Sequence, residues 1–211
     1  EGFGLTETAP VASALGANEV IEHAGSVGKP IAHVEYRVVG DDGREVPTGE
    51  VGELLIRGPN VFVGYWQKPE ATREVLDEDG WFHSGDLARV DAQGYYFIVD
   101  RKKDMVISGG ENVYPAEIEQ VLYQRPEIAE VAVLGTPDPR WGEAVTAVIV
   151  LKAGQQLEAD ELMAWARQRL AGFKCPRVVR FVDHLPRTAT GKLLKRELRQ
   201  QFGGAEAAVQ R

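Results

Sequence analysis

The sequence has 211 residues, 44% of them hydrophobic and 27% charged, which is typical of a folded globular protein and excludes a largely disordered chain. Its net charge of −8 excludes a general nucleic-acid binder, because neutralising phosphates needs an excess of Lys and Arg. The single cysteine, Cys175, excludes an internal disulfide and a multi-thiolate zinc site. The first residues do not have the charged-then-apolar pattern of a signal peptide, and no run of about 18 apolar residues could span a membrane, so we expect a cytoplasmic protein.

The charge is distributed unevenly along the chain. Residues 1–100 contain 7 basic and 18 acidic residues, a net charge of −11, whereas residues 101–211 contain 17 basic and 14 acidic residues, a net charge of +3. This asymmetry predicts two bodies that bind different ligands. The numbering also opens at Glu1, inside a motif, so we expect the sequence to begin within a longer polypeptide.

The first hundred residues alternate short apolar runs with turn signals, which predicts a β-rich unit with one short helix. The expected strands are 34–40, 51–58 and 94–100, with a turn at 41–43 and a helix at 69–76.

Beyond residue 100 the pattern predicts helices interleaved with three strands, a small α+β body. The expected helices are 115–123, 159–170 and 190–202, and the expected strands are 130–135, 144–152 and 177–182. The predicted fold class is therefore α+β, with a compact β-rich unit over 1–100, an α+β lobe over 101–204 and a flexible tail over 205–211.

Two short segments of the first unit contain residues suited to a nucleotide. In GFGLTET at positions 2–8, glycines let the backbone approach a ligand, Thr6 can hydrogen-bond a phosphate and Glu7 can hold Mg²⁺. In WFHSGD at positions 81–86, Asp86 can accept both hydroxyls of a ribose. The alternatives are a polar turn at the first segment and a capping or turn carboxylate at the second.

Two further segments lie in the basic half. The run DRKKDMVISGGENVYP at 100–115 combines five charged residues, an apolar triplet and a double glycine. It is either a solvated loop or, given its place between two bodies, a moving joint. In PRTATGK at 186–192, Lys192 follows a glycine near the expected start of a helix. This is not a P-loop, because Pro186 stands where the first glycine of that motif is required. Lys192 is either solvated or a point charge for a carboxylate or phosphate.

Together, in this order and spacing, the four segments resemble the AMP-forming adenylating enzymes: acyl-CoA synthetases, peptide-synthetase adenylation domains and firefly-type luciferases. The resemblance covers residues 1–202. It implies the carboxy-terminal portion of such an enzyme: residues 1–100 as the last, β-barrel-like subdomain of the large adenylating domain and residues 101–204 as the mobile carboxy-terminal lobe. The amino-terminal domain that holds most of the acyl pocket would be missing. The implied activity is that of an ATP-dependent ligase that forms acyl-AMP from a fatty or aryl acid and then an acyl-CoA thioester, and we expect the fragment alone to be inactive.

The resemblance also implies roles for individual residues. Thr6 corresponds to a phosphate contact and Glu7 to the magnesium ligand. Asp86 and Arg101 correspond to partners of the ribose hydroxyls, and Ile98 packs near the adenine. Lys192 resembles the lysine that bridges the substrate carboxylate and the α-phosphate.

For the second half-reaction, Lys103 lies at the family's hinge position. Gly109 and Gly110 would line a channel for the pantetheine arm of CoA, where side chains would obstruct it. For the nucleotide end of CoA, Trp141 and Phe173 stand at positions where some CoA ligases present aromatic surface, and Lys174 and Arg177 could meet phosphates. Core packing is an equally good reading of the two aromatic residues. One position that is basic in a related ligase is Cys175 here, which puts the phosphate contacts in doubt.

The segment SGGENVYP favours CoA ligases, and Ile107 replaces a lysine of luciferase-like members. Two alternatives remain: a non-catalytic module that binds a nucleotide or CoA, and an adenylating enzyme that uses a carrier-protein thiol. The histidines at 23, 33, 83 and 184 lack zinc-ligand spacing, and Ser108 lacks the glycine of a nucleophile elbow, so metalloenzyme and hydrolase readings are excluded.

Overall fold

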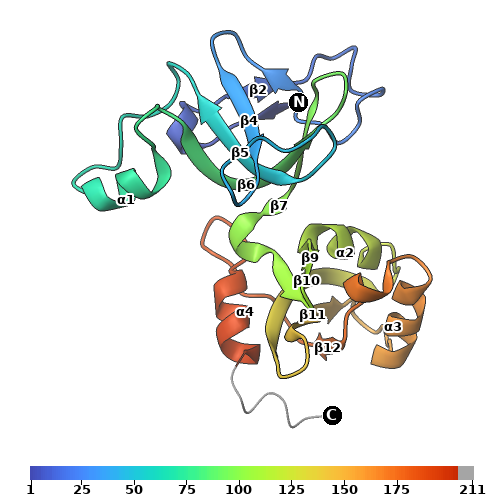
Figure 1. Ribbon diagram of the computed structural model, residues 1–211. Coiled ribbons are helices and arrows are strands. Elements are labelled where there is room, and N and C mark those ends of the chain that lie inside the picture. Colours follow the sequence, from blue (N-terminus) through green and yellow to red (C-terminus); the bar gives the residue numbers. More distant parts are fainter. Residues whose placement is uncertain (204–211) are drawn as a thin grey trace. The chain divides into compact units, whose positions relative to one another are not determined.

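The computed structural model describes residues 1–203 and divides the chain into two compact units. The first is Glu1–Lys102 and the second begins at Lys103, so the division lies two residues beyond the boundary expected from the sequence (Figure 1). The flexible tail expected over 205–211 lies outside the described residues. Within the described part, no helix is both long and apolar enough to cross a membrane.

The first unit contains a four-stranded antiparallel sheet in the order β4-β5-β6-β7. Its strands are β4 (Glu35–Val39), β5 (Gly52–Arg57), β6 (Phe82–Val90) and β7 (Tyr96–Arg101). All the strands expected in this region are thus confirmed. Alternate residues of β4 turn inward, and Tyr36, Val38 and their neighbours Leu54 and Ile56 on β5 form the core of the unit, as a one-sided sheet requires.

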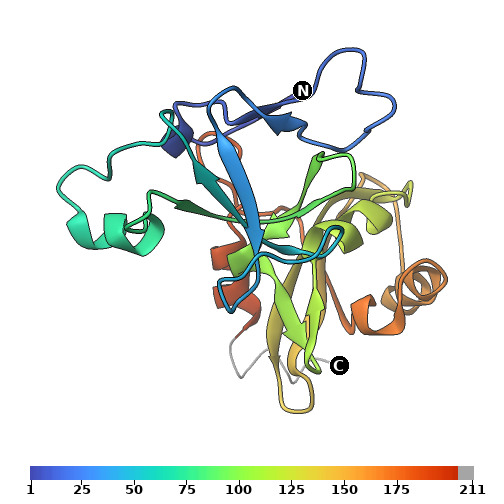
Figure 2. The same cartoon turned by 45° about the horizontal axis from the view of Figure 1, so that its top comes forward.

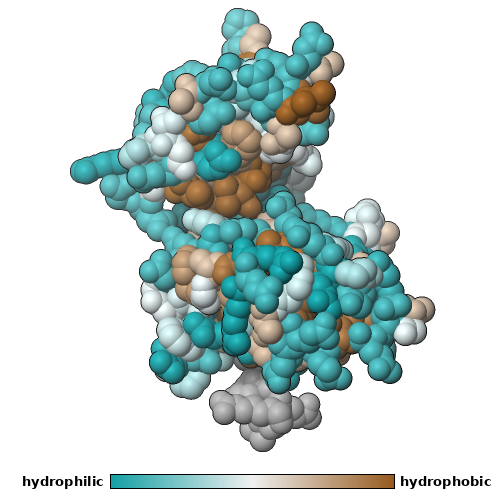
Figure 3. Space-filling view, turned by 90° about the vertical axis from the view of Figure 1, so that its right-hand side faces the viewer, coloured by the Kyte–Doolittle hydropathy of each residue, from teal (hydrophilic) through white to brown (hydrophobic). Residues whose placement is uncertain are grey.

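A second, smaller sheet joins β1 (Gly2–Phe3), β2 (Ser13–Ala14) and β3 (Lys29–Pro30) in an antiparallel arrangement (Figure 2). Phe3 packs on the same core cluster as β4 and β5. The short helix α1 (Pro69–Val75) is also confirmed, with Pro69 in its first turn. The sheets of the described residues stay open, so the expected barrel-like unit is a pair of open sheets and not a closed barrel. Apolar residues reach the surface of this unit as a patch in Figure 3.

The second unit is built on a five-stranded sheet in the order β10-β11-β8-β9, with β12 parallel to β11. The strands are β8 (Val106–Ser108), β9 (Glu111–Val113), β10 (Ile128–Asp138), β11 (Gly142–Leu151) and β12 (Val178–Phe181), and the helices are α2 (Pro115–Leu122), α3 (Ala159–Arg167) and α4 (Lys195–Phe202). The α+β class is confirmed. The expectation of three strands is wrong, because the sheet has five. The two additional strands, β8 and β9, are only three residues long, which is too short to give a periodic signal in the sequence.

Helices cover both faces of this sheet. Val131 and Val133 of β10 pack with α2 and α3, whereas the intervening Ala132 and Leu134 pack with Leu198 of α4. A strand buried on both faces needs apolar residues at every position, which explains the continuous apolar runs of β10 and of its neighbour β11.

The last helix begins later than expected. We predicted a helix from residue 190, but α4 starts at Lys195. Gly191 has φ +84°, outside the helical region, and residues 188–192 close a turn in which the Thr188 N–H donates to the Lys192 carbonyl at 2.8 Å. Lys192 therefore lies in a turn that precedes the helix, not at its start.

Candidate functional site

The predicted site residues are divided between the two units. Thr6, Glu7, Asp86, Ile98 and Arg101 belong to the first, whereas Lys103 and the residues after it belong to the second. Each set is described within its own unit.

Asp86 and Arg101 lie directly opposite each other on β6 and β7, and the Arg101 Nε lies 2.7 Å from the Asp86 Oδ1. Ile98 pairs with Ala88 on the same two strands. Asp86 and Ala88 are two residues apart and share a face of the sheet. Ile98 and Arg101 are three apart, so a regular strand would place them on opposite faces. The register shift between these two pairs is a β-bulge that brings both to the face of Asp86.

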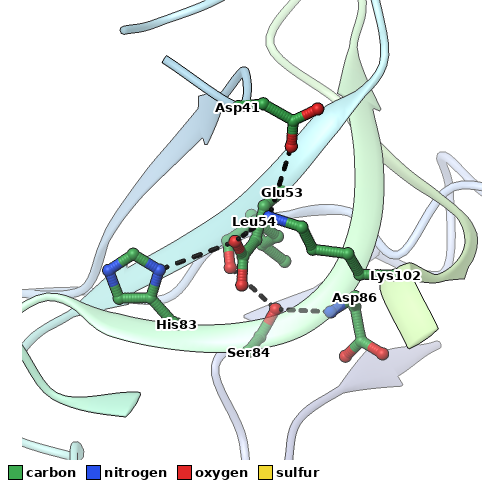
Figure 4. A network of polar contacts seen from close by, with 7 residues as sticks. All are labelled: Asp41, Glu53, Leu54, His83, Ser84, Asp86 and Lys102. Carbon is green, nitrogen blue, oxygen red and sulfur yellow. Dashed lines mark hydrogen bonds and ion pairs between the residues drawn. The ribbon is translucent and has the colours of Figure 1, made fainter. Parts of the chain in front are cut away.

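A buried hydrogen-bond network holds the backbone at Asp86, as drawn in Figure 4. The Ser84 hydroxyl donates to the Leu54 carbonyl at 2.7 Å, and the Asp86 N–H donates to the Ser84 Oγ at 3.1 Å. Asp86 is 4% exposed, whereas the side chain of Arg101 is 41% exposed. The carboxylate of the pair is thus buried, and its guanidinium partner is open to solvent.

Next to this pair, four side chains form a second network (Figure 4). The Lys102 Nζ lies 3.0 Å from the Glu53 Oε2 and 3.5 Å from the Asp41 Oδ1, and the His83 Nδ1 lies 3.6 Å from the same Glu53 oxygen. The hydrogen bond to Glu53 is the main cause that raises the pKa of the Lys102 ammonium. The network ties the end of β7 to β5.

The segment around Thr6 and Glu7 forms a 3-10 turn, Thr6–Thr8. Fully buried Thr8 holds it: its hydroxyl accepts from the Leu5 N–H at 2.9 Å and donates to backbone carbonyls. Thr6 is exposed, and the Glu7 Oε1 accepts a hydrogen bond of 2.8 Å from the Tyr65 hydroxyl. A Cβ at Gly4 would lie 1.6 Å from the Pro10 carbonyl oxygen, so this glycine is needed for the close approach of two backbone segments.

The expected joint contains the 3-10 turn Lys102–Asp104 followed by the hairpin of β8 and β9. Lys103 is exposed. Arg199 of α4 reaches the turn: its Nη2 lies 2.7 Å from the Asp104 Oδ1 and 3.3 Å from the Lys103 carbonyl oxygen. The charged run thus ends in an ordered turn that Arg199 contacts, with Lys103 exposed to solvent between Lys102 and Asp104, and the rest of the segment is a hairpin.

Gly109 and Gly110 form the two-residue turn of that hairpin, with φ of +64° and +85°. Positive φ at both central residues is typical of a type I′ turn, which glycine accommodates without strain. The Gly109 N–H donates to the Trp141 carbonyl at 2.8 Å, and a Cβ on Gly109 would lie 2.8 Å from the Trp141 Cε3. A Cβ on Gly110 would meet no atom within 4 Å.

These contacts predict different costs for two otherwise identical substitutions. We expect Gly109→Ala to lower the free energy of unfolding by about 2 kcal/mol or more, because it combines a left-handed backbone with a clash against the indole. Gly110→Ala should lower it by about 1 kcal/mol from the backbone alone. Urea unfolding followed by circular dichroism measures both. Equal losses would show that the Trp141 contact has no energetic consequence.

Trp141 lies between two cations. The Arg177 guanidinium carbon is 3.9 Å and that of Arg140 is 4.7 Å from the centre of the indole. Trp141 is partly exposed and Arg177 is exposed, so the three residues form a basic aromatic surface beside the glycine turn. Sequence reasoning did not identify Arg140, although it directly precedes Trp141.

The other residues predicted to contact CoA are engaged within the unit. Phe173 packs against the core cluster of α2 and α3, which supports the core-packing reading of that residue. The Lys174 Nζ contacts both carboxylate oxygens of Glu117, at 2.7 and 2.8 Å. Cys175 is 5% exposed, and burial is the main cause that raises the pKa of its thiol. Its position thus supplies no group to a phosphate.

Lys192 stands in a braced turn. Its N–H donates to the Thr188 Oγ1 at 3.1 Å, and the Arg187 Nη1 donates to the Gly191 carbonyl at 2.8 Å. Arg187 also pairs with Glu130 of β10. The Lys192 side chain is exposed at the end of this turn.

Two protein-family models match this chain, one in each of its two units. Residues 1–66 match the model of the AMP-binding enzyme family, and residues 117–192 match that of the AMP-binding enzyme C-terminal domain. This chain belongs to the AMP-binding enzyme family. The resemblance read from the four sequence segments is thus confirmed.

Relatives of this AMP-binding family chain include a feruloyl-CoA synthase from an Amycolatopsis species, 54% identical over 203 residues, which are 96% of this chain and 41% of that protein. A long-chain-fatty-acid–CoA ligase of Escherichia coli O6:H1 is 46% identical over 97% of this chain and 36% of its own length. The crystal structure of ATP-bound MatB from Rhodopseudomonas palustris aligns with a TM-score of 0.87 at 40% identity, covering 96% of this chain and 40% of that one. The chain therefore spans about 40% of the length of such relatives.

Several residues that build the site of this family member were not identified from the sequence. Each of them acts through a hydrogen bond to a residue at least 30 positions away in the sequence: Ser84 to Leu54, Tyr65 to Glu7 and Arg199 to Asp104. The residue type at one position does not predict such a contact. The glycine hairpin, by contrast, had a local signal, because a Gly-Gly pair that separates two short runs containing valine or isoleucine is typical of a two-residue turn.

Proposed function

We propose that the protein is an AMP-forming acid–thiol ligase that uses ATP, Mg²⁺ and CoA, and that this chain supplies its ribose-binding face, its joint and its catalytic lysine. In the first half-reaction, a carboxylate oxygen of the acid attacks the α-phosphorus of ATP and the bond to the β-phosphate breaks, releasing pyrophosphate. In the second, the CoA sulfur attacks the acyl carbon, AMP leaves and the thiol proton is lost.

The observation that carries the proposal is the shared face of Asp86, Ile98 and Arg101, created by the bulge in β7. A buried carboxylate and a mobile guanidinium can both meet ribose hydroxyls, and an adjacent apolar side chain suits an adenine ring. The movable Arg101 side chain is needed for this, because it contacts Asp86 in the structure.

Glu7 is suited to hold Mg²⁺ together with the phosphates. The Tyr65 hydroxyl donates to its Oε1 and so orients the carboxylate, and Oε2 would be the oxygen that holds the ion. Among residues 1–203 no group of three or more acidic, His or Cys side chains is arranged to hold a metal. Mg²⁺ is commonly bound by one or two carboxylates plus substrate phosphates and water, so a single Glu7 fits. When bound, the ion would neutralise charge on the phosphates, beside which Thr6 offers a hydroxyl.

In the second unit, the surface of Trp141, Arg140 and Arg177 has the chemistry to bind the adenine and phosphates of CoA. We propose a stacking role for Trp141 and phosphate contacts for Arg177. Lys174 would have to leave Glu117 to contribute, and Phe173 serves mainly in packing. Gly109 and Gly110 leave the path to this surface free of side chains.

A chimera tests the proposed activity without assumptions about the ends of the chain. We would insert this chain in place of the corresponding segment of the Amycolatopsis feruloyl-CoA synthase, to which it is 54% identical. The expected result is pyrophosphate release that requires ATP and an acid, followed by thioester formation with CoA across a panel of aryl and fatty acids. The chain alone should release none.

The same assay distinguishes the alternatives. Nucleotide binding by a chimera that releases no pyrophosphate would favour a non-catalytic module. Pyrophosphate release without any CoA thioester, together with acylation of a carrier-protein thiol, would favour the carrier-dependent class. Robust turnover by the chain alone would contradict the proposed division of the site.

A further inference from the structure

The chain on the first-unit side of Lys103 is fixed by strand pairing and by an ion-pair network. The backbone of Arg101 pairs with that of Asp86 on β6, whichever way its side chain turns. The Lys102 ammonium pairs with Glu53 of β5 and with Asp41 (Figure 4). The Glu53 side chain is only 12% exposed, so its contact with Lys102 is less screened by solvent than an ordinary surface pair. Both residues therefore move with the first unit.

On the other side, Arg199 fixes the chain to α4. Its guanidinium contacts the Asp104 carboxylate, whose side chain is 15% exposed, and the Lys103 carbonyl oxygen. That oxygen belongs to the planar peptide group that joins Lys103 to Asp104. The whole peptide group therefore moves with the second unit, and so does the turn of Lys192, which precedes the same helix.

Lys103 lies between these anchors. It is exposed, and within residues 1–203 no ion pair of its ammonium is recorded. The dihedrals left free are φ and ψ of Lys103 and ψ of Lys102. We propose that Glu53, Asp41 and Arg199 are positioning residues that confine rotation between the two units to Lys103.

This inference rests on the proposed function and deepens it. It names the residues that would define the two orientations of the second unit, one for each half-reaction. A rotation spread over several loose bonds would place Lys192 and the glycine turn in many positions. Confining it to one residue restricts the second unit to a few orientations, which two successive half-reactions at one site require.

The test measures the distribution of distances between spin labels, one on each unit, in the chain without any ligand. Gln93→Cys and Ala164→Cys provide exposed sites, whereas native Cys175 is too buried to label readily. We expect discrete distances in the parent and a wider distribution after Arg199→Gln or Glu53→Gln. Hydrogen exchange of the amides at 104–106 should become about fivefold faster in Arg199→Gln, as loss of a partly exposed ion pair implies.

Lys195→Gln is the matched control, because it removes another 2.7 Å ion pair, to Glu119, from the same helix without touching the joint. It should leave the distribution unchanged, and Arg199→Lys should partly restore it. If Arg199→Gln does not fold, Asp104→Asn breaks the same pair from the other side. A parent distribution as broad as that of the variants, or equal broadening by Lys195→Gln, would overturn the proposal. Because no ATP or CoA is used, failure of the proposed activity would leave these outcomes intact.

Discussion

Replacing Lys192 by alanine in the feruloyl-CoA synthase chimera should reduce acyl-AMP formation by about 10²–10³-fold, the usual loss when one group that stabilises developing charge is removed. Lys192 is exposed at the end of a turn that Arg187 and Thr188 hold in place, so its ammonium is presented on a rigid base. The carboxylate and the α-phosphate are both anionic as they approach, and a point charge between them lowers the barrier to that step. Pyrophosphate release at saturating ATP measures the effect.

The rate of the second half-reaction shows whether Lys192→Ala impairs adenylation specifically or disrupts the structure in general. Thioester formation from supplied acyl-AMP and CoA should stay near the parent rate, because no carboxylate and phosphate meet in that step. Arg196→Ala removes an exposed cation four residues further on and should alter neither half. An equal loss of both halves in Lys192→Ala would contradict a role in adenylation alone.

Much of this architecture could be predicted because it is written in local patterns. The continuous apolar runs of β10 and β11 and the Pro-initiated helices α1 and α2 were each located from composition and periodicity. The start of the last helix was predicted too early, at residue 190 in place of Lys195. Gly191 has a positive φ, which a right-handed helix does not allow. Local propensity was overridden there by a turn that the distant Arg187–Glu130 pair holds in place.

The candidate site could be proposed as a set of residues but not as a geometry. Asp86 was singled out by its residue type and Ile98 and Arg101 by the resemblance to adenylating enzymes, yet period-2 counting places Ile98 and Arg101 on opposite faces. The bulge that reunites them is a register shift between strands, which no single segment encodes. Likewise, Asp104 and Arg199 are 95 residues apart in sequence, and only the packing of α4 on the sheet brings them together.

Lys103→Pro tests the joint itself and should have the opposite effect to Lys192→Ala. Proline fixes φ near −65° at its own position and disfavours helical ψ at the residue before it, so it restricts the dihedrals that Lys102 and Lys103 leave free. Lys103 lies in a 3-10 turn, where φ is already close to the proline value, so position 103 itself should accommodate proline and the strain should fall on ψ of Lys102 at the start of the turn. We expect adenylation to be largely retained and thioester formation from acyl-AMP to fall by about 10²-fold, since an incompatible proline costs about 3 kcal/mol.

Lys103→Ala is the control that separates dihedral restriction from loss of the side chain. Alanine keeps the freedom of φ and ψ, and the exposed Lys103 ammonium has no ion pair recorded among the described residues, so both half-reactions should continue close to the parent rates. If alanine impaired thioester formation as much as proline, the lysine side chain and not rotation would be responsible. If neither substitution affected the second half, the units would have to exchange arrangements through other bonds, and the anchors formed by Glu53 and Arg199 would not define the joint.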